Sequence, residues 1–361
     1  MKITQVCSLQ EDKKLDPAAD LYTYPIKSLR SVPLQTTAVT TDGFPYDRRF
    51  MVVRVHKDDS TKARSKKHFD PKTRLENMTI TYWPELSLFL QTLNESKGTI
   101  VVEHCPPDRS KTRIEVPSKP DVKKLGFVDI NLHESPTKAY KMDDHVNAWF
   151  SKCLGFSAML IYLGPHRRKL CGNLSPDPVS KSSSWVPGVV SGSSTAETKI
   201  TFADLAAYLV VTEESLADVS ERLTGNMKAD VTKFRPNIVV SGAAKPWDED
   251  YWAGLTITKR NGSSNDSTEM VLTANCGRCA SLNVDYKTGK FGKGEEGTVL
   301  KKMMKDRRVD PGNKYSPICG RYGFLKPGTV SAGRRIAVGD EVTLSKRNAQ
   351  RTVFGKWRNQ L

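Results

Sequence analysis

Two cysteines on one short turn are the feature of this 361-residue sequence best suited to chemistry. Residues 275–285 read Asn-Cys-Gly-Arg-Cys-Ala-Ser-Leu-Asn-Val-Asp, so Gly277 and Arg278 separate Cys276 from Cys279. A thiolate is a soft metal ligand and a nucleophile, and a neighbouring cation such as Arg278 favours the thiolate form. Cys279 therefore has the surroundings of a functional sulfur.

The spacing of the two cysteines has three chemical explanations: half of a zinc site, a dithiol redox pair, or one functional thiolate beside a bystander. The other five cysteines form no second pair, and the six histidines lack close ligand spacing. A redox pair belongs between a strand and a helix, whereas residues 280–284 alternate like a strand. These points favour one thiolate ligand or nucleophile, while a plain turn with two half-buried cysteines stays open.

Composition limits the class of protein. The net charge of +16 allows a nucleic acid, an anionic membrane surface or an anionic small molecule as partner. No apolar run approaches the roughly 18 residues of a membrane span, so we expect no transmembrane segment.

Seven scattered cysteines indicate a reducing compartment. Residues 1–20 hold four acidic residues and no Arg, unlike a transit peptide, and predict a cytoplasmic protein.

Two regions concentrate positive charge. Residues 62–74 are strongly basic, but Phe69 is their only aromatic residue, so we expect a solvated loop and no nucleic-acid partner. Residues 301–308, with Arg334 and Arg335, are a candidate docking face for an acidic protein or a solvated surface.

Short apolar stretches between turn residues predict a mainly β chain with a few helices, an α+β class. In the first half, strands are expected at residues 35–41, 50–55, 78–83, 86–90 and 99–103. In the second half, they are expected at residues 238–240, 255–259, 270–273, 280–284 and 341–344.

Helices are expected where apolar residues recur at helical spacing. A buried stripe from Val146 to Leu154 follows a capping Asp143 or Asp144 and stops before Gly155, which makes Cys153 a core residue. A second helix is expected after Thr212, which would be its N-cap, with Glu213 and Glu214 in its first turn. A third helix is expected over residues 298–305.

A shift to Ser, Pro and Gly between residues 165 and 197 predicts a linker. The expected division is a first domain over residues 1–170, a linker over 171–197 and a second domain over 198–350. Residues 6–20 look like an insertion before the strand that leads to Tyr24, either an inserted loop or a gene-model error.

Four motifs occur in order along the chain. They are Tyr24-Pro25-Ile26-Lys27-Ser28, Asp47-Arg48-Arg49-Phe50, residues 234–242 and residues 276–285. As an ordered set they resemble the MOSC family, specifically its two-part members with an N-terminal MOSC-associated β-barrel, such as the amidoxime-reducing enzymes. The resemblance implies a small N-terminal β-barrel domain followed by a MOSC-type β-barrel domain.

The resemblance also implies a site for a molybdenum–molybdopterin cofactor. Cys279 would ligate molybdenum, and Cys276 would be the bystander. Asp204 would relay protons, although a helix cap or turn bond is an equal explanation for an Asp there. Leu205 and Ala206 stand where amidoxime-reducing relatives have a Thr-Ser pair. The expected cofactor contacts are Lys27, Ser28, Arg48, Arg235, Asn237 and Arg278.

The activity implied is reduction of a small N-hydroxylated substrate with electrons from a cytochrome-b5-type haem protein and its flavin reductase. The alternative is a sulfur-carrier or cofactor-handling protein in which Cys279 bears a persulfide. A third reading is a basic binding module without enzymatic activity. The resemblance points to mitochondrial association, against the cytoplasmic location that the N-terminal composition predicts.

Overall fold

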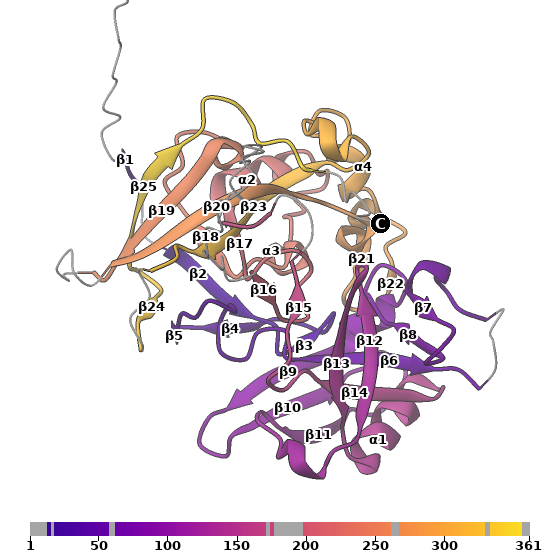
Figure 1. The fold of residues 1–361 in the computed structure, drawn as a ribbon. Coiled ribbons are helices and arrows are strands. Elements are labelled where there is room, and N and C mark those ends of the chain that lie inside the picture. Colours follow the sequence, from indigo (N-terminus) through magenta and orange to yellow (C-terminus); the bar gives the residue numbers. More distant parts are fainter. Residues whose placement is uncertain are drawn as a thin grey trace, which may run out of the picture.

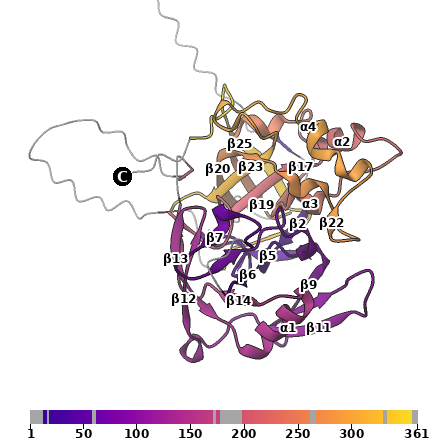
Figure 2. The ribbon, with the colours of Figure 1, turned by 90° about the vertical axis from the view of Figure 1, so that its right-hand side faces the viewer.

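The computed structural model describes residues 13–15, 18–57, 62–170, 174–176, 198–260, 267–328 and 333–355. The chain is mainly β, as the sequence predicts, and its strands form two bodies that lie against each other (Figure 1). In Figure 1 most of the first half of the chain, in indigo to magenta, lies below the second half, in orange to yellow. Figure 2 shows the same two bodies from the side.

A nine-stranded sheet forms the upper body. Its neighbouring strands are antiparallel except β17 and β18, which run parallel. The order from edge to edge is β1 (Lys13–Lys14), β25 (Glu341–Arg347), β19 (Trp252–Thr258), β20 (Ser267–Gly277), β23 (Ile318–Leu325), β17 (Tyr208–Thr212), β18 (Ile238–Val240), β2 (Ala18–Thr23) and β4 (Val32–Leu34).

The lower body is a nearly closed barrel with a small sheet beside it. The barrel strands are β12 (Phe127–Leu132), β13 (Ser135–Lys141), β14 (Ala158–Tyr162), β6 (Phe50–Val55), β8 (Leu75–Asn77) and β7 (Phe69–Asp70), with β3 (Ile26–Lys27) parallel to β6. The small sheet has the order β11 (Thr112–Pro117), β10 (Thr99–His104) and β9 (Phe89–Asn94).

Three two-stranded ribbons complete the sheets. They pair β15 (Arg168–Lys169) with β16 (Lys199–Ile200), β21 (Val284–Asp285) with β22 (Lys290–Phe291), and β24 (Arg335–Ala337) with β5 (Thr36–Ala38). Single turns of 3₁₀ helix lie between strands: η1 (Lys66–His68), η2 (Pro84–Leu88), η3 (Val122–Lys124), η4 (Asp248–Tyr251), η6 (Ala280–Asn283), η7 (Glu295–Gly297) and η8 (Pro311–Asn313).

The predicted helices form where their capping residues lie. Helix α1 (Asp144–Leu154) begins after Asp143, buries Cys153 and ends at Gly155, whose φ of 77° a glycine adopts without strain. In α2 (Glu213–Glu221), the Thr212 hydroxyl accepts the Ser215 amide, a side-chain N-cap. The remaining helices are α3 (Val231–Phe234) and α4 (Val299–Met303), the latter at the predicted position.

Some strand predictions are wrong. Residues 280–284 form η6 and only the start of β21, because the chain turns at Cys279, and the Leu282 amide bonds back to the Cys279 carbonyl. Residues 78–83 form a turn closed by amides of Tyr82 and Trp83 on the Thr79 carbonyl. Residues 84–88 are helical, so β9 begins only at Phe89.

Part of the segment expected to be an inserted loop belongs to the upper sheet, so that expectation is wrong for those residues. Lys13 and Lys14 pair with Leu344 and Thr343, and β2 begins at Ala18. Residues 6–12, 16 and 17 lie outside the described residues. The upper body is thus built from both ends of the sequence, while the predicted domain boundaries stay a prediction.

In the described part of the chain, no helix has the length and apolarity required to cross a membrane. The linker prediction falls almost wholly on residues 171–173 and 177–197, which lie outside the described residues.

Candidate functional site

Cys279 lies where the two bodies meet, and its thiol is exposed. Its Sγ atom is 3.2 Å from the Thr81 hydroxyl, which belongs to the lower body, and 3.2 Å from the Ser281 hydroxyl, which follows it in η6. The other described cysteines are less accessible: Cys153, Cys276 and Cys319 are buried, and Cys105 is half-buried. Cys279 is therefore the described thiol best placed to meet a ligand at this junction.

The turn that presents Cys279 is tightly held. The Arg278 amide donates to the Pro317 carbonyl at 2.8 Å. A Cβ atom on Gly277 would lie 2.0 Å from the Asn313 side-chain nitrogen, so any larger residue there would displace the Asn313 side chain. The turn between the two cysteines is thus set by its packing against residues 313–317.

The Arg278 side chain is buried and donates to backbone carbonyls. Its Nε and Nη2 atoms donate to the Cys319 carbonyl, and Nη1 donates to the Phe234 carbonyl at 2.6 Å. The sequence suggested a cofactor contact for Arg278. In this structure its three nitrogens join the cysteine turn to β23 and to the residue preceding Arg235, and the cofactor contact stays a prediction.

Cys276 has different surroundings from Cys279. Its side chain is 4% exposed and lies in the apolar core of the upper sheet. Burial raises the pKa of the Cys276 thiol. These surroundings suit a small core residue. In the part of the chain that the structure describes, no group of three His, Cys, Asp or Glu side chains is arranged to hold a metal ion.

Asp204 meets two basic side chains of the lower body. Its Oδ1 atom forms an ion pair with the Lys27 ammonium and lies 3.3 Å from Nε2 of His133. The Asp204 side chain is 55% exposed. Partial desolvation would by itself raise the pKa of its carboxyl, but Lys27 and His133 hold that pKa well below its usual range. Asp204 is therefore an anion at neutral pH.

The two bases respond to burial in the expected direction. Lys27 is 4% exposed and also donates to the Phe202 carbonyl at 3.0 Å. Burial lowers the pKa of Lys27 to about 8, although Asp204 opposes the shift. Burial likewise lowers the pKa of His133. At neutral pH the cluster can therefore hold a charged lysine and a neutral histidine on one carboxylate.

The Arg168 side chain holds the backbone near Asp204 through hydrogen bonds to three carbonyls. It is 1% exposed, and its guanidinium donates to the carbonyls of Leu132 at 2.9 Å, Thr201 at 3.0 Å and Ala203. Sequence reasoning missed Arg168, His133 and Thr81. Their partners lie 33 to 198 positions away, so no local spacing could have signalled them.

The next residues after Asp204 depart from the pattern expected of amidoxime-reducing relatives. Ala206 is buried in the core of the upper sheet, and Leu205 is half-buried against it. Neither side chain can donate a hydrogen bond. Any ligand held here would have to use backbone amides or the neighbouring cations.

Two arginines enclose Tyr24. The Arg48 guanidinium carbon is 4.5 Å from the ring centroid, and that of Arg235 is 4.4 Å away. Arg48 also pairs with Asp47 at 2.5 Å and reaches the Arg235 carbonyl at 3.3 Å. These contacts bring together two motifs that are 187 positions apart in sequence.

Asn237 supports this pair and its sheet. Its Oδ1 atom accepts from the Leu209 amide at 3.2 Å and from Arg48 at 3.4 Å, while Nδ2 donates to the Tyr22 carbonyl at 3.2 Å. Asn237 is 1% exposed, so its amide is committed to protein partners.

Backbone strain is concentrated among the predicted site residues. Ser28, Arg48 and Arg235 have φ values of 70°, 49° and 55°, in the left-handed region that residues other than glycine rarely adopt. His133, which contacts Asp204, has a φ of 54°. Such strain persists where surrounding contacts enforce it, and it is enriched at ligand sites.

The residues fit an anionic group with directional acceptors. In the described part of the chain, the Nη2 atom of Arg235 and the hydroxyl of Tyr24 are buried without a hydrogen-bond partner. An unsatisfied buried guanidinium nitrogen is costly unless a ligand supplies an acceptor. Lys27, Ser28, Arg48 and Arg235 can thus offer donors to a phosphate-bearing cofactor, with Cys279 offering a soft ligand to its metal.

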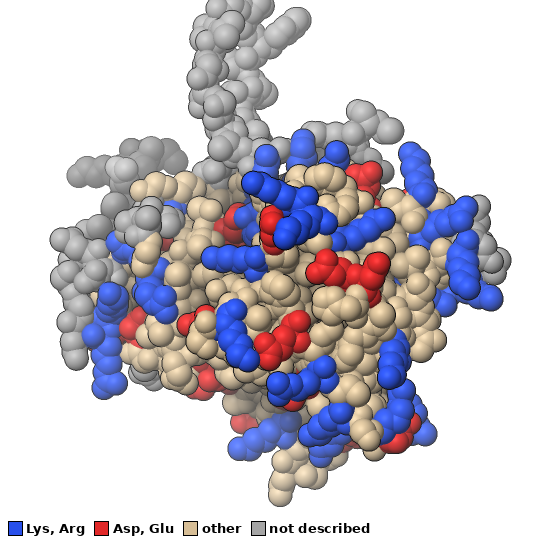
Figure 3. Space-filling model, turned by 90° about the horizontal axis from the view of Figure 1, so that it is seen from below, with Lys and Arg blue, Asp and Glu red and all other residues tan. Residues whose placement is uncertain are grey.

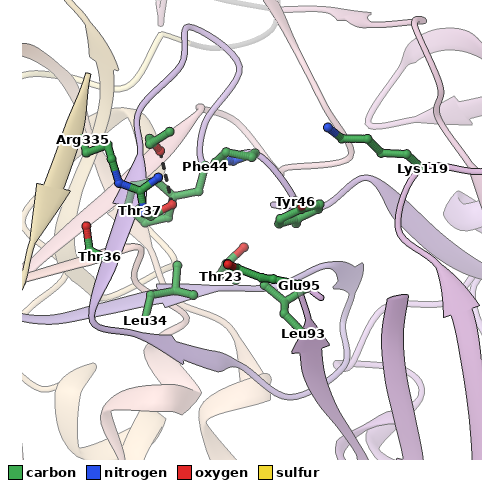
Figure 4. A pocket seen from close by; sticks show the side chains of 12 residues that line it. Thr23, Leu34, Thr36, Thr37, Phe44, Tyr46, Leu93, Glu95, Lys119 and Arg335 are labelled. Atoms are coloured by element: carbon green, nitrogen blue, oxygen red, sulfur yellow. Dashed lines mark hydrogen bonds between the residues drawn. The ribbon is translucent and has the colours of Figure 1, made fainter. Parts of the chain in front are cut away.

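Two hollows in the structure do not include these residues. One, of about 400 Å³, is lined by side chains such as Thr37, Tyr46 and Arg335 (Figure 4). The other, of about 390 Å³, shares Phe44, Pro45, Tyr46 and Lys119 with it. Neither Cys279 nor Asp204 lines either hollow, so the candidate site lies outside both of them.

The basic segment 62–74 is only partly a solvated loop. Arg64 pairs with Glu85 at 2.8 Å and lies over the Trp83 ring at 3.8 Å, and Arg74 donates to the Lys57 carbonyl. On the face shown in Figure 3, lysines and arginines alternate with acidic side chains. The positive charge there is spread out.

Lys27 makes the first testable prediction. Its pKa of about 8 lies below the ordinary 10.5, so the unfolded chain binds more protons between these pH values and Lys27 adds stability as pH rises through that window. From pH 8 to 10, the free energy of unfolding of the parent should rise by roughly 2 kcal/mol relative to Lys27→Met. Urea unfolding measures this difference, and Lys119→Met, at an exposed lysine, is the control. A Lys27→Met difference that stays flat with pH would refute the shifted pKa.

Two family models match the chain. The MOSC N-terminal beta barrel domain matches residues 18–157, and the MOSC domain matches residues 197–343. The two matches include Lys27, Ser28, Arg48, Asp204, Arg235 and Cys279, whereas Arg168 lies between them.

Relatives of two kinds are similar to the chain. The molybdenum cofactor sulfurase of Oryza sativa subsp. japonica is 24% identical over 88% of this chain and 34% of that protein. The mitochondrial amidoxime-reducing component 1 of Homo sapiens is 35% identical over 37% of each chain. That of Mus musculus is 25% identical over 89% of this chain and 82% of that protein. The chain spans about a third of the length of the plant sulfurase it matches.

Proposed function

Because this chain belongs to the MOSC family and carries a MOSC N-terminal beta barrel ahead of its MOSC domain, we propose that it is a molybdenum-cofactor-dependent oxidoreductase. The observation that carries this proposal is the exposed Cys279 thiol, which lies at the junction of the two bodies beside a hydroxyl from each. A lone accessible thiolate suits a soft metal ion whose other ligands come from the cofactor itself.

The cofactor would be held by residues of both bodies. Arg48 and Arg235 supply fixed positive charge, Lys27 adds a titratable one, and the unpartnered Nη2 atom of Arg235 supplies a donor for a phosphate or pterin oxygen. Cys279 would ligate molybdenum. Arg278 and Asn237 act as positioning residues in this proposal, because their polar atoms already bond to the protein.

The proposed reaction is the reduction of an N-hydroxylated compound. An amidoxime R–C(NH₂)=N–OH, two electrons and two protons give R–C(NH₂)=NH and water, with cleavage of the N–O bond. The cofactor, when bound, supplies the two-electron oxygen transfer. The protein's part is to bind and orient the substrate and to move protons.

The protons would be supplied through Lys27 and His133, the two basic side chains that contact Asp204. The Asp204 carboxyl, whose pKa is held well below its usual range, is a poor acid at neutral pH, and it orients Lys27 and His133. Lys27, with a pKa of about 8, is charged at neutral pH and can release a proton. In this assignment Asp204 is the anchor of the proton relay and Lys27 is its acid.

The electrons require a partner. The similarity to amidoxime-reducing components supports a cytochrome-b5-type haem protein and its flavin reductase as donors. The names of these relatives also support mitochondrial association. Fractionation of cells that express a tagged chain tests this association.

A second candidate function is sulfur carriage or cofactor handling through a Cys279 persulfide. It is favoured by the match to molybdenum cofactor sulfurase, which runs along 88% of the chain. An exposed thiol with hydroxyl neighbours is as compatible with a persulfide as with a metal ligand.

Elemental analysis of the purified protein tests both candidates. The proposal expects about one molybdenum per chain, together with a released pterin, and reduction of benzamidoxime by dithionite-reduced viologen. If cyanide treatment releases sulfane sulfur, and the protein holds no molybdenum after expression in a molybdate-supplied host, the second candidate function replaces the oxidoreductase. Absence of both would exclude the two together.

A further inference from the structure

Residues 348–355 follow the last strand of the upper sheet and cross the end of β20, just before the cysteine turn. They lie beyond residue 343, where the match to the MOSC domain ends. The Thr352 carbonyl accepts the Asn275 side-chain amide at 3.0 Å, and the Thr352 hydroxyl accepts from Nη1 of Arg321 at 2.5 Å. The same Arg321 nitrogen donates to Oδ1 of Asn275 at 2.6 Å.

A second tie involves a buried aspartate. The Phe354 amide donates to both Asp310 oxygens, at 3.0 and 3.2 Å. Asp310 is 1% exposed and also accepts from the Gly312 amide and from the Asn275 side chain. A Cβ atom on Gly312 would lie 1.8 Å from the Phe354 carbonyl oxygen, so the segment packs directly on η8.

The start of the segment is anchored by charge. Arg347 pairs with both oxygens of Asp248, at 2.8 and 2.9 Å, and Arg351 donates to Asp250 at 2.8 Å. Both carboxylates are buried in η4, and the Asn348 amide bonds to the Tyr251 carbonyl at 2.8 Å. The Arg347 and Arg351 side chains are 29% and 34% exposed, so each pair joins a buried carboxylate to a partly solvated guanidinium at the start of the segment.

The contacts of Thr352, Arg321 and Asp310 converge on Asn275, the residue before Cys276. Asn275 is 1% exposed, and its polar side-chain atoms contact Thr352, Asp310 and Arg321. We propose that residues 348–355 are a latch that positions the turn from Cys276 to Cys279. Thr352 is its central positioning residue. The inference concerns the turn itself, so it holds whether Cys279 carries molybdenum or sulfur.

The alkylation rates of Cys276 and Cys279 measure whether residues 348–355 hold the cysteine turn closed. Cys276 is 4% exposed, so its alkylation requires the turn to open, whereas the exposed Cys279 reacts without opening. Trypsin cleaves after Arg260, Arg278 and Lys287, which places the two cysteines on separate peptides, residues 261–278 and 279–287. Mass spectrometry of the iodoacetamide-treated protein therefore follows each thiol, with Cys279 as the internal reference.

Thr352→Val removes the hydroxyl that accepts from Arg321 and keeps the shape of the side chain. Loss of this charge-assisted bond should speed Cys276 alkylation about tenfold, with Cys279 alkylation near the parent rate. Truncation after Arg347 should have a larger effect. Thr352→Ser, which keeps the hydroxyl, should restore the parent rate, and Gln350→Ala, at an exposed position of the same segment, should leave it unchanged.

The rescue by serine separates positioning from general destabilisation, and the unfolding temperature of each variant is measured alongside. Molybdenum retained after gel filtration is a second readout: the proposal expects less in Thr352→Val than in Thr352→Ser. Equal Cys276 alkylation in the parent, Thr352→Val and the truncated chain would overturn the latch. That outcome would leave the metal content of the parent, and so the proposed function, unaffected.

Discussion

Cys279→Ser should lose benzamidoxime reduction by at least about a hundredfold, because even an outer-shell partner of a metal ligand is worth about 10- to 100-fold. The substitution exchanges a soft, charged thiolate for a hard, neutral hydroxyl. The fold should survive, because the Cys279 side chain is exposed and its described contacts are the Thr81 and Ser281 hydroxyls. Activity with dithionite-reduced viologen, expressed per folded chain, measures the loss without a natural partner.

Cys276→Ser is the matched control. Its buried thiol lies in the core of the upper sheet, so placing a hydroxyl there should cost about 1–3 kcal/mol of stability. Activity per folded chain should stay near that of the parent. Equal loss from both substitutions would indicate a dithiol, and full activity in Cys279→Ser would remove the ligand assignment.

Arg168→Met should lower the free energy of unfolding by about 3–5 kcal/mol, because three buried carbonyls lose a charged donor and each unsatisfied acceptor costs about 1–3 kcal/mol. The guanidinium donates to three carbonyls that bound the Asp204 loop, those of Leu132, Thr201 and Ala203. Methionine fills much of the same volume and cannot donate, so these buried acceptors lose their partner. Urea unfolding followed by tryptophan fluorescence measures the change.

Arg167→Met provides the comparison from the neighbouring position. Arg167 pairs with Asp42 at 2.6 Å, but their side chains are 20% and 33% exposed. A partly solvated pair of this kind contributes about 1 kcal/mol or less. Similar losses of unfolding free energy from the two substitutions would show that the hydrogen bonds of Arg168 to buried carbonyls contribute no more stability than a partly solvated ion pair.

The sequence determined the elements whose signals are local. The strand from Phe50 to Val55 and α1, with Asp143 before it and Gly155 after it, were predictable because alternation, helical spacing and caps act within a few residues. The two-part β class and the MOSC family followed from motifs in order along the chain, and both are confirmed.

Local pattern was insufficient where a turn or a packing contact dominates. Residues 280–284 alternate like a strand, yet they fold into η6 because Gly277 packs on Asn313 and Arg278 bonds across to Pro317. The strand predicted at residues 78–83 was wrong in the same way, since backbone bonds to Thr79 close a turn there. The strand predicted at residues 86–90 begins only at Phe89, because residues 84–88 are helical.

Only the tertiary structure decided how the site residues meet. It placed Thr81 on Cys279, His133 and Lys27 on Asp204, and the segment of Thr352 on Asn275. It also gave Arg278 and Asn237 protein partners, which no motif reveals. These contacts join residues 28 to 198 positions apart, and the low local dielectric that strengthens such polar contacts exists only once both bodies have folded.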